Sequence, residues 1–159
     1  MKRILTYDDI HNGALKLIDM IQHQGSIPDL VVGFSRGGLL PATILSHYFE
    51  CQFQALAVTY RDAAATGFKY DDLKCIDALI RCNKNVIIVD DICDSGKTFI
   101  KFHEYYDDVN PQHINIDNIK TAAIHHRYTS LYTPDFIAEH IVNDDWQVYP
   151  WEVTLNKEV

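Results

Sequence analysis

The chain has 159 residues, of which 47% are hydrophobic and 23% charged, a composition typical of one globular domain with a substantial core. Fourteen basic residues against 22 acidic ones give a net charge of −8, which argues against general nucleic-acid affinity. The sequence near the start lacks a signal-peptide core and no apolar run is long enough to span a membrane, so we expect a cytoplasmic protein without a membrane partner. The four cysteines lack metal-ligand spacing and are interpreted as reduced thiols.

Hydrophobic periodicity predicts alternating strands and helices. Thr6 or Asp8 is expected to cap the first helix. The segment 61–71 has no stable period and is interpreted as a mobile loop. The predicted elements are a helix over 6–24, a strand over 29–34, a helix ending near 49, a strand over 55–60, a helix over 72–81, a strand over 86–89, a helical run over 99–106 and a strand over 118–125. This order predicts an α/β fold with a mainly parallel sheet covered by helices on both faces.

The most informative segment is 86–98, VIIVDDICDSGKT. Asp90 and Asp91 follow the predicted strand, and Asp94 precedes a small-residue turn that opens a helix. In an open α/β sheet this edge forms the ligand crevice, and the free amides of the helix start suit a phosphate. Carboxylates beside a phosphate site indicate a divalent cation, sugar hydroxyls or a proton in transit. The alternative is an ordinary turn in which the acids cap a helix.

Two further features bear on how this segment is interpreted. A phosphate-loop NTPase is excluded, because its motif needs a glycine where this chain has Asp91. A second strand–turn–helix unit at 31–41 contains Arg36 and the pair Gly37-Gly38, which let backbone amides approach an anion closely. A tight turn without a ligand is the more usual interpretation of such a glycine pair.

Segment 86–98 resembles the phosphoribosyl-pyrophosphate signature of the type I phosphoribosyltransferases, with Lys97 where many members have a small residue. The loop at Ser35 and the tail from Trp146 to Glu152 resemble those of bacterial and archaeal xanthine-guanine and hypoxanthine enzymes. The resemblance implies a single domain, with a twisted parallel-sheet core at about 1–126, a mobile lid loop, and a small base-binding hood at about 127–159.

The same resemblance implies the reaction. The enzyme would transfer 5-phosphoribosyl from phosphoribosyl pyrophosphate to a 6-oxopurine (hypoxanthine, guanine or xanthine), giving the nucleoside monophosphate and pyrophosphate. Mg²⁺ is the implied cofactor, and a homo-oligomer, either a dimer or a tetramer, is the implied assembly. Water would hydrolyse the activated sugar, so we expect segment 61–71 to close over the site, with Arg61 or Lys69 reaching the pyrophosphate.

The resemblance also implies the roles of individual residues. Asp94 is the expected general base at the seven-position nitrogen of the purine. Asp90 and Asp91 are expected to hold the ribose hydroxyls and Mg²⁺, mainly through water and substrate. The 5-phosphate is assigned to Asp94, Ser95, Gly96, Lys97 and Thr98, and the pyrophosphate to Ser35, Arg36, Gly37 and Gly38. The Ser35–Arg36 peptide bond is expected to be cis.

The tail is expected to choose the base. Trp146 is predicted to stack on the purine and Trp151 to pack, and backbone groups near Trp146 and Gln147 are predicted to read the Watson–Crick edge. Arg127 occupies the position where relatives have a lysine that donates to the six-position oxygen. A guanidinium can only donate, so this departure still favours a 6-oxopurine over adenine. The alternatives are core or interface tryptophans and a surface arginine.

Three other interpretations remain open from the sequence. One is a phosphoribosyltransferase for another base. A second is a non-catalytic regulatory or effector-binding protein of the same fold. The pair His125-His126 is a metal site or simply two histidines at a strand end or surface. Cys93 lies at a spacer position of the signature, and no chemistry is assigned to it.

Overall fold

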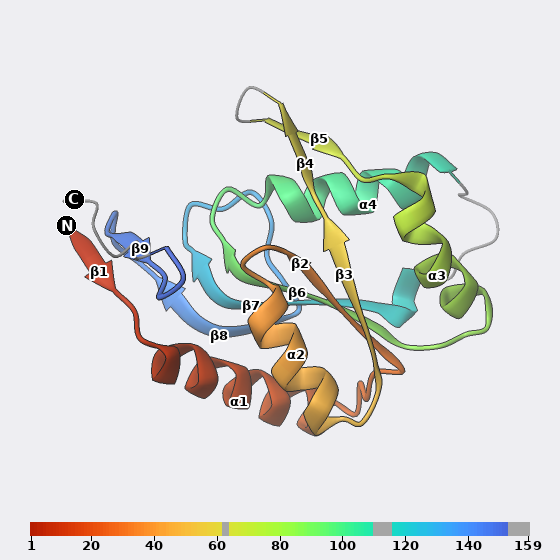
Figure 1. The fold of residues 1–159 in the computed structure, drawn as a ribbon, viewed down its shortest axis with the longest axis horizontal. Coiled ribbons are helices and arrows are strands. Elements are labelled where there is room, and N and C mark those ends of the chain that lie inside the picture. Colours follow the sequence, from red (N-terminus) through yellow and green to blue (C-terminus); the bar gives the residue numbers. More distant parts are fainter. Residues whose placement is uncertain (62–63, 110–115, 153–159) are drawn as a thin grey trace.

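The computed structural model describes residues 1–61, 64–109 and 116–152, and in these ranges the chain folds around a five-stranded sheet (Figure 1). The strand order is β3-β2-β6-β7-β8, and every neighbouring pair is parallel. The elements are β1 (Lys2–Ile4), α1 (Tyr7–Gln24), β2 (Leu30–Ser35), α2 (Leu39–Tyr48), β3 (Gln52–Ala57), β4 (Thr59–Arg61), β5 (Ala64–Gly67), α3 (Tyr70–Arg81), β6 (Val86–Cys93), α4 (Lys97–Val109), a 3-10 turn (Ile116–Asn118), β7 (Ile119–Arg127), β8 (Phe136–Ile141) and β9 (Trp146–Val148). The predicted α/β class with a mainly parallel sheet is confirmed.

Helices cover both faces of the sheet, α1 and α2 on one side and α3 and α4 on the other (Figure 1). Successive residues of β2 divide between the two cores: Val31 packs with α1 and α2, whereas Val32 and Phe34 pack with α3 and α4. Because side chains of a strand alternate between faces, a strand buried on both faces forms the continuous apolar run seen in the sequence. Among the described helices, none has the length and apolar character needed to cross a membrane.

The first helix begins where the sequence predicts, with Thr6 as its cap. The Thr6 hydroxyl accepts from the Asp9 amide at 3.2 Å, and the Asp9 carboxylate accepts from the Thr6 amide at 2.8 Å. These reciprocal bonds satisfy two amides that lack partners within the helix. They also hold the pKa of Asp9 below its usual value, because they favour the charged carboxylate.

The strand β6 is longer than predicted, which is the main correction to the sequence analysis. Its apolar pattern stops after 86–89 and predicts that Asp90 and Asp91 follow the strand, but β6 continues to Cys93. The parallel neighbour β7 accompanies this extension and pairs Ala123 with Asp90, whereas the ladder to β2 ends before Asp90. The two carboxylates therefore lie in a strand that has only one neighbour, which an apolar pattern cannot reveal.

The segment 61–71 is the second correction. Instead of a loop, β4 and β5 form an antiparallel hairpin in which Arg61 faces Ala64, and α3 begins at Tyr70. Residues 62–63, part of the predicted lid, lie outside the described ranges. Phe68 follows the hairpin and stacks on Phe34 of the core with ring centroids 5.6 Å apart. Strands this short are held mainly by backbone hydrogen bonds, so their sequence shows no regular alternation of apolar residues.

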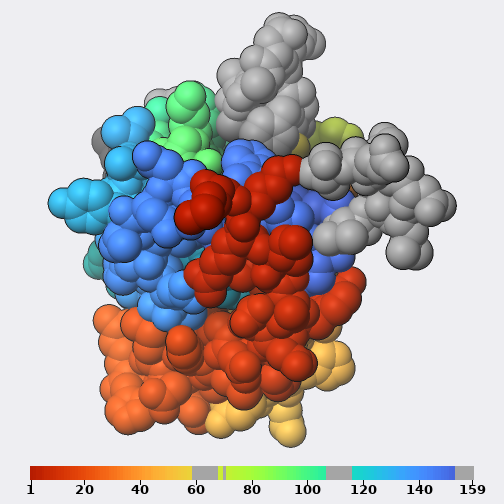
Figure 2. Space-filling view, turned by 90° about the vertical axis from the view of Figure 1, so that its left-hand side faces the viewer, coloured from red at the N-terminus to blue at the C-terminus, as the bar shows by residue number. Residues whose placement is uncertain are grey.

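The N-terminal strand lies against the C-terminal segment, a pairing that no motif predicted. β1 and β9 are parallel, with Lys2 opposite Trp146, and the amino group of Met1 binds Asp145 Oδ1 at 2.7 Å. Figure 2 shows the N-terminal segment (red) lying across the C-terminal one (blue). The beginning of the chain thus supports the segment that the resemblance assigns to the base.

Candidate active site

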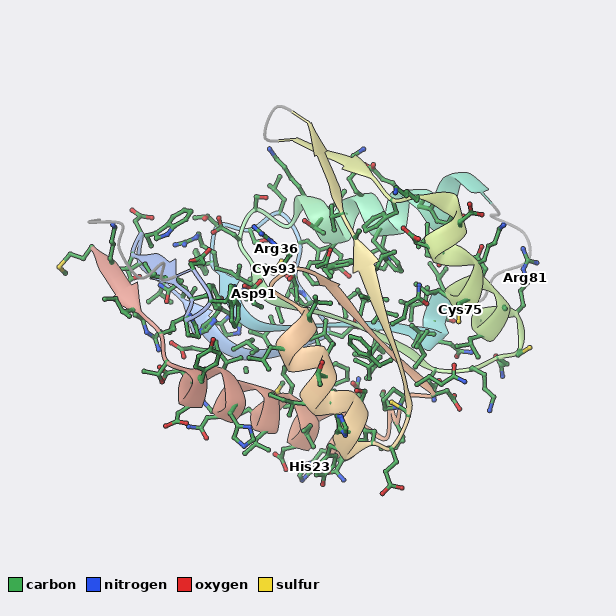
Figure 3. The ribbon with its side chains drawn as sticks, viewed as in Figure 1. His23, Arg36, Cys75, Arg81, Asp91 and Cys93 are labelled. Carbon is green, nitrogen blue, oxygen red and sulfur yellow. The ribbon has the colours of Figure 1, made fainter. Side chains whose placement is uncertain are left out.

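A cleft of 1080 Å³ opens at the carboxyl ends of β2 and β6, the edge of the sheet where the sequence predicts a ligand. Both predicted phosphate loops line it, with Ser35 to Gly37 on one side and residues 94–98 on the other. Asp90 and Asp91 lie between them. Figure 3 shows Arg36 and Asp91 at this edge of the sheet. The two sequence motifs therefore form one site.

Glycine allows the loop after β2 to lie directly against β6. The Ser35–Arg36 bond is cis, as the resemblance implies. A Cβ built on Gly37 would lie 2.2 Å from Asp91 Oδ2, and one on Gly38 would lie 2.3 Å from a carbonyl oxygen of β6. A side chain at either position would displace the loop or the strand. Gly38 itself is buried at the cap of α2 and does not line the cleft, so the surface of this predicted loop is formed by the residues before it.

Asp90 and Asp91 are adjacent, partly buried carboxylates. Asp90 Oδ1 accepts from the Asp91 amide at 3.0 Å, and Asp91 Oδ1 accepts from the Ile92 amide at 2.8 Å. Burial raises the pKa of Asp91 to about 6. Burial, together with the neighbouring Asp91 charge, raises the pKa of Asp90 well above its usual range. Among the described residues, no positively charged side chain lowers either pKa.

The pair of carboxylates fits the role toward Mg²⁺ that the resemblance implies. Carboxylate oxygens are ligands that Mg²⁺ prefers, and a divalent cation beside the pair would lower the two pKa values that burial raises. In the described part of the chain, no group of three or more His, Cys, Asp or Glu residues can hold a metal ion. An ion at Asp90 and Asp91 would therefore complete its coordination with water and substrate oxygens.

The turn after β6 presents the start of α4 to the cleft. Ser95 Oγ accepts from the Lys97 amide at 3.4 Å, and Gly96 adopts a φ of 78°, which favours glycine. A Cβ on Gly96 would also lie 2.7 Å from Tyr132 atoms, and the Leu131 amide donates to the Ser95 carbonyl at 3.2 Å. The loop after β7 thus supports the turn from behind, and the amides at the helix start suit an anion.

A smaller cavity of 470 Å³ contains residues predicted to bind the base. Arg127 enters it from the end of β7 and Trp146 from the start of β9. Asp94 and Ser95 line both this cavity and the larger cleft. Asp94 is therefore situated where the two spaces meet.

Arg127 joins the turn after β6 to the C-terminal segment. Its Nε forms an ion pair with Asp94, while Nη1 donates to the Asn143 carbonyl at 2.9 Å and Nη2 to the Asp145 carbonyl at 3.4 Å. The Arg127 side chain is 16% exposed, so the alternative of an ordinary surface arginine is wrong. Its guanidinium fixes the position of the Asp94 carboxylate relative to the hood.

The two tryptophans occupy different spaces. Trp146 is 60% exposed and lines the smaller cavity. Trp151 stacks on Tyr149 with ring centroids 4.9 Å apart and rings inclined by 21°, a packing contact of the kind predicted. It also lines the larger cleft, together with Glu152, which the sequence analysis did not anticipate.

The backbone at the start of β9 is partly engaged by other groups. The Trp146 amide donates to the Met1 carbonyl at 2.9 Å, so it is not a free member of the backbone groups near Trp146 and Gln147 that are predicted to read the base. Gln147 is buried, and its side-chain amide donates to the Asp145 carbonyl at 3.0 Å. The pairing of β1 with β9 explains the difference, because an added parallel strand takes up the free edge of β9.

Sequence reasoning missed Tyr149 and the contact that His125 makes with it. The Tyr149 hydroxyl donates to the Asp91 carbonyl at 3.1 Å and lies 2.8 Å from His125 Nδ1. Burial lowers the pKa of His125. His125 and His126 do not form a metal pair, because adjacent residues of a strand face opposite sides, and His126 instead contacts His140. No local signal identifies these contacts, which join segments far apart in the chain.

Comparisons with known proteins agree with this geometry. The model of the phosphoribosyl transferase domain family matches residues 6–158. The xanthine-guanine phosphoribosyltransferase of Cereibacter sphaeroides is 24% identical over 163 residues, covering 95% of this chain and 87% of that protein. Among solved structures, purine phosphoribosyltransferase from Pyrococcus horikoshii shares 26% identity and a TM-score of 0.74, covering 99% of both chains. A hypothetical protein from Neisseria gonorrhoeae with bound ppGpp shares 24% identity and a TM-score of 0.71, covering 96% of this chain and 91% of that chain.

The match to the family model thereby confirms the predicted family, and the geometry of the site agrees with it. The family model covers almost the whole chain, and both phosphate loops that carry the resemblance line one cleft. The protein belongs to the phosphoribosyl transferase domain family.

Proposed function

We propose that the protein is a purine phosphoribosyltransferase that transfers 5-phosphoribosyl from phosphoribosyl pyrophosphate to a 6-oxopurine. The single observation that carries this proposal is that Asp94 and Ser95 line both the large cleft and the smaller cavity. A sugar donor in the first and a base in the second would meet at Asp94. The names of the proteobacterial and archaeal relatives support a purine as the acceptor.

The donor would bind along the cleft in an extended arrangement. Its 5-phosphate would lie on the turn at 95–98, where amides at the start of α4 suit an anion. Its pyrophosphate would lie against Ser35–Gly37, with Arg36 as a permanent multi-donor cation. The ribose hydroxyls would fall between the loops, beside Asp90 and Asp91.

The carboxylates of β6 would hold Mg²⁺ through water and substrate, and the bound ion would neutralise negative charge on the leaving pyrophosphate. As the bond between the anomeric carbon and pyrophosphate breaks, the sugar gains cationic character. Asp90 and Asp91 stabilise that charge because they are fixed in the strand and partly removed from water. The nine-position nitrogen of the base forms the new bond to this carbon.

Asp94 would receive the proton that the base must lose. It accepts the proton from the seven-position nitrogen while the nine-position nitrogen attacks, and Arg127 holds the carboxylate in place through its ion pair. The products are the nucleoside monophosphate and pyrophosphate, so each bond formed is matched by one broken. The 6-oxygen of the purine would face Arg127, which donates, and its seven-position nitrogen would face Asp94, which accepts.

This arrangement gives a physical reason for preferring 6-oxopurines. Arg127 can only donate, so an amino group at the six position of adenine would place a donor against a donor. Trp146 offers a flat exposed ring for stacking, which contributes about 1–3 kcal/mol per base in nucleic-acid-binding proteins. The same contacts accept hypoxanthine, guanine and xanthine alike.

The direct test is an activity assay with a panel of bases. The purified protein would be incubated with phosphoribosyl pyrophosphate, Mg²⁺ and each of hypoxanthine, guanine, xanthine, adenine and uracil, and nucleotide and pyrophosphate would be measured. We expect turnover with one or more 6-oxopurines and little with adenine or uracil. Turnover confined to adenine or uracil would refute the base assignment.

A second candidate is a non-catalytic effector-binding protein of the same fold. The gonococcal structure with bound ppGpp favours it, because a related fold there holds a nucleotide with two pyrophosphoryl groups. Absence of turnover with every base, combined with tight calorimetric binding of ppGpp or the donor, would support this candidate over the enzyme.

A further inference from the structure

The carbonyl of Asp91 has a partner from outside the sheet. At this point β6 retains β7 as a neighbour but has lost β2, whose ladder ends at Val89. The Tyr149 hydroxyl, which comes from the C-terminal segment, donates to the Asp91 carbonyl at 3.1 Å. Tyr149 is 3% exposed, so this hydrogen bond is sheltered from water. Buried carbonyls are stable only when hydrogen-bonded, and Tyr149 supplies a partner to this one from outside the sheet.

The protons in this contact can be assigned by counting donors. A carbonyl oxygen only accepts, so the single hydroxyl proton of Tyr149 goes to Asp91. The hydroxyl oxygen is then the acceptor for His125 Nδ1, which lies 2.8 Å away and must carry a proton. The His125 side chain is 2% exposed, and its Nε2 lies 3.8 Å from Glu139 Oε2. Through the Tyr149 hydroxyl, the hydrogen bonds therefore run from His125 to Asp91.

Tyr149 also fixes the corner of the C-terminal segment that lines the cleft. Its ring stacks on Trp151, and its amide donates to Glu152 Oε2 at 3.0 Å. Both Trp151 and Glu152 line the cleft with Asp91. One buried side chain thus sets the position of a β6 peptide and of the opposing corner.

We propose that Tyr149 and His125 are positioning residues that hold the Asp91 peptide and the Trp151–Glu152 corner at a fixed separation for the sugar donor. This inference rests on the proposed function, because it assigns Asp91 to the ribose. Neither side chain touches the reacting atoms. Their effect reaches the donor through the ribose contact at Asp91 and through the Trp151–Glu152 corner, which both form before the chemical step, so they should change donor affinity more than turnover.

The test uses variants that remove or restore one hydrogen bond at a time. Tyr149→Phe removes the hydroxyl, and His125→Leu removes the imidazole donor. His125→Asn keeps a donor close to the position of Nδ1. Two exposed residues provide matched controls, Tyr128→Phe and His140→Asn. Steady-state kinetics and calorimetric donor binding would be measured for each variant, together with its melting temperature.

We expect Tyr149→Phe and His125→Leu to raise the donor KM and Kd about tenfold while kcat changes less than threefold. His125→Asn should restore both constants to within about threefold of wild type. The double variant Tyr149→Phe/His125→Leu should be no worse than Tyr149→Phe alone, because the contacts form one chain. The two controls should match wild type.

Results that contradict the positioning role differ from those that contradict the proposed function. An unchanged donor Kd in Tyr149→Phe, or a His125→Asn variant as weak as His125→Leu, would overturn the positioning role. A lowered melting temperature without a change in donor KM would also overturn it, since that result indicates structural stability alone. Wild-type protein that neither binds the donor nor turns over would refute the proposed function itself, and this inference with it.

Discussion

Arg127 and Asp94 form an ion pair at the point where the two cavities meet, although 33 positions separate them in the chain. Arg127 is anchored on its other side by the carbonyls of Asn143 and Asp145. A carboxylate that is 50% exposed is thereby held in one place without being buried. This is the geometry that a general base needs, because proton transfer depends on its position relative to the substrate.

Replacing the Asp94 carboxylate should therefore affect turnover and spare donor binding. Asp94→Asn keeps the shape of the side chain but removes its ability to take a proton. We expect kcat to fall at least ~100-fold, the usual range for general-base catalysis. Calorimetric Kd for the donor should stay within about threefold of wild type. Asp19→Asn, an exposed site on α1, is the matched control, and unchanged turnover in Asp94→Asn would remove the general-base role.

Replacing Arg127 should affect the base more than the donor. Arg127→Ala removes the donor that, in the proposed function, would face the six-position oxygen. A charged hydrogen bond of this kind contributes about 1.5–3 kcal/mol, or roughly 10–150-fold in base KM. Arg127→Lys should fall between Ala and wild type, because lysine keeps the charge but not the planar fork that holds two carbonyls. Initial rates at varied base and varied donor separate the two effects. A larger rise in donor KM would place Arg127 elsewhere in the site.

Much of the fold could be predicted from the sequence because the responsible signals are local. The apolar run of β2 and the cap at Thr6 each depend on residues close together in the chain. The extension of β6 through Asp90 and Asp91 could not be predicted, because it depends on pairing with β7 rather than on side-chain hydrophobicity. The hairpin of β4 and β5 was missed for a similar reason, since its short strands are joined through the backbone.

In the candidate site, too, local motifs could be predicted from the sequence and long-range contacts could not. Its two phosphate loops are contiguous motifs, and the structure brings them into one cleft. The hydrogen bonds that link His125, Tyr149 and Asp91 could not be predicted, because they join β7, the tail and β6. Backbone groups near Trp146 and Gln147 are predicted to read the base, but the sequence does not reveal that the Trp146 amide donates to Met1, because that bond depends on where the first strand lies. A single sequence records such long-range contacts only indirectly.

The close approach of Gly37 to Asp91 predicts a separable defect. In Gly37→Ala the new Cβ would lie 2.2 Å from Asp91 Oδ2, so either the carboxylate or the pyrophosphate loop must move. We expect donor KM to rise at least about tenfold, as displacement of a positioned group by a fraction of an ångström weakens a preorganised site. Steady-state kinetics at saturating base would measure this change.

Gly25→Ala provides the contrasting control for that variant. Gly25 has a φ of 73° and nothing within 4 Å of a built Cβ, so alanine there strains the backbone without touching the site. It should lower stability by about 1 kcal/mol and leave donor KM unchanged. If both variants changed donor KM equally, the contact between Gly37 and Asp91 would not explain the defect.

The raised pKa of Asp91 predicts a pH-dependent stability penalty. Burial raises this pKa from 3.8 to about 6, so between these values the folded protein binds more protons at Asp91 than the unfolded chain does. Stability from this group therefore falls as pH rises through that window. In the metal-free protein above about pH 6, the folded state holds a partly buried, ionised Asp91 next to Asp90.

Removing the charge with Asp91→Asn should consequently stabilise the metal-free protein while impairing donor binding. At pH 7.5 we expect the variant to be more stable than wild type by about 1–2 kcal/mol, a discounted value for a carboxylate that water still reaches. The difference should shrink to nothing near pH 3, below the pKa of 3.8 that Asp91 has in the unfolded chain, because both states are then protonated. Urea unfolding at both pH values, with EDTA present, measures it. An exposed replacement, Asp8→Asn, should show no such pH dependence, and a variant less stable than wild type at pH 7.5 would contradict the argument.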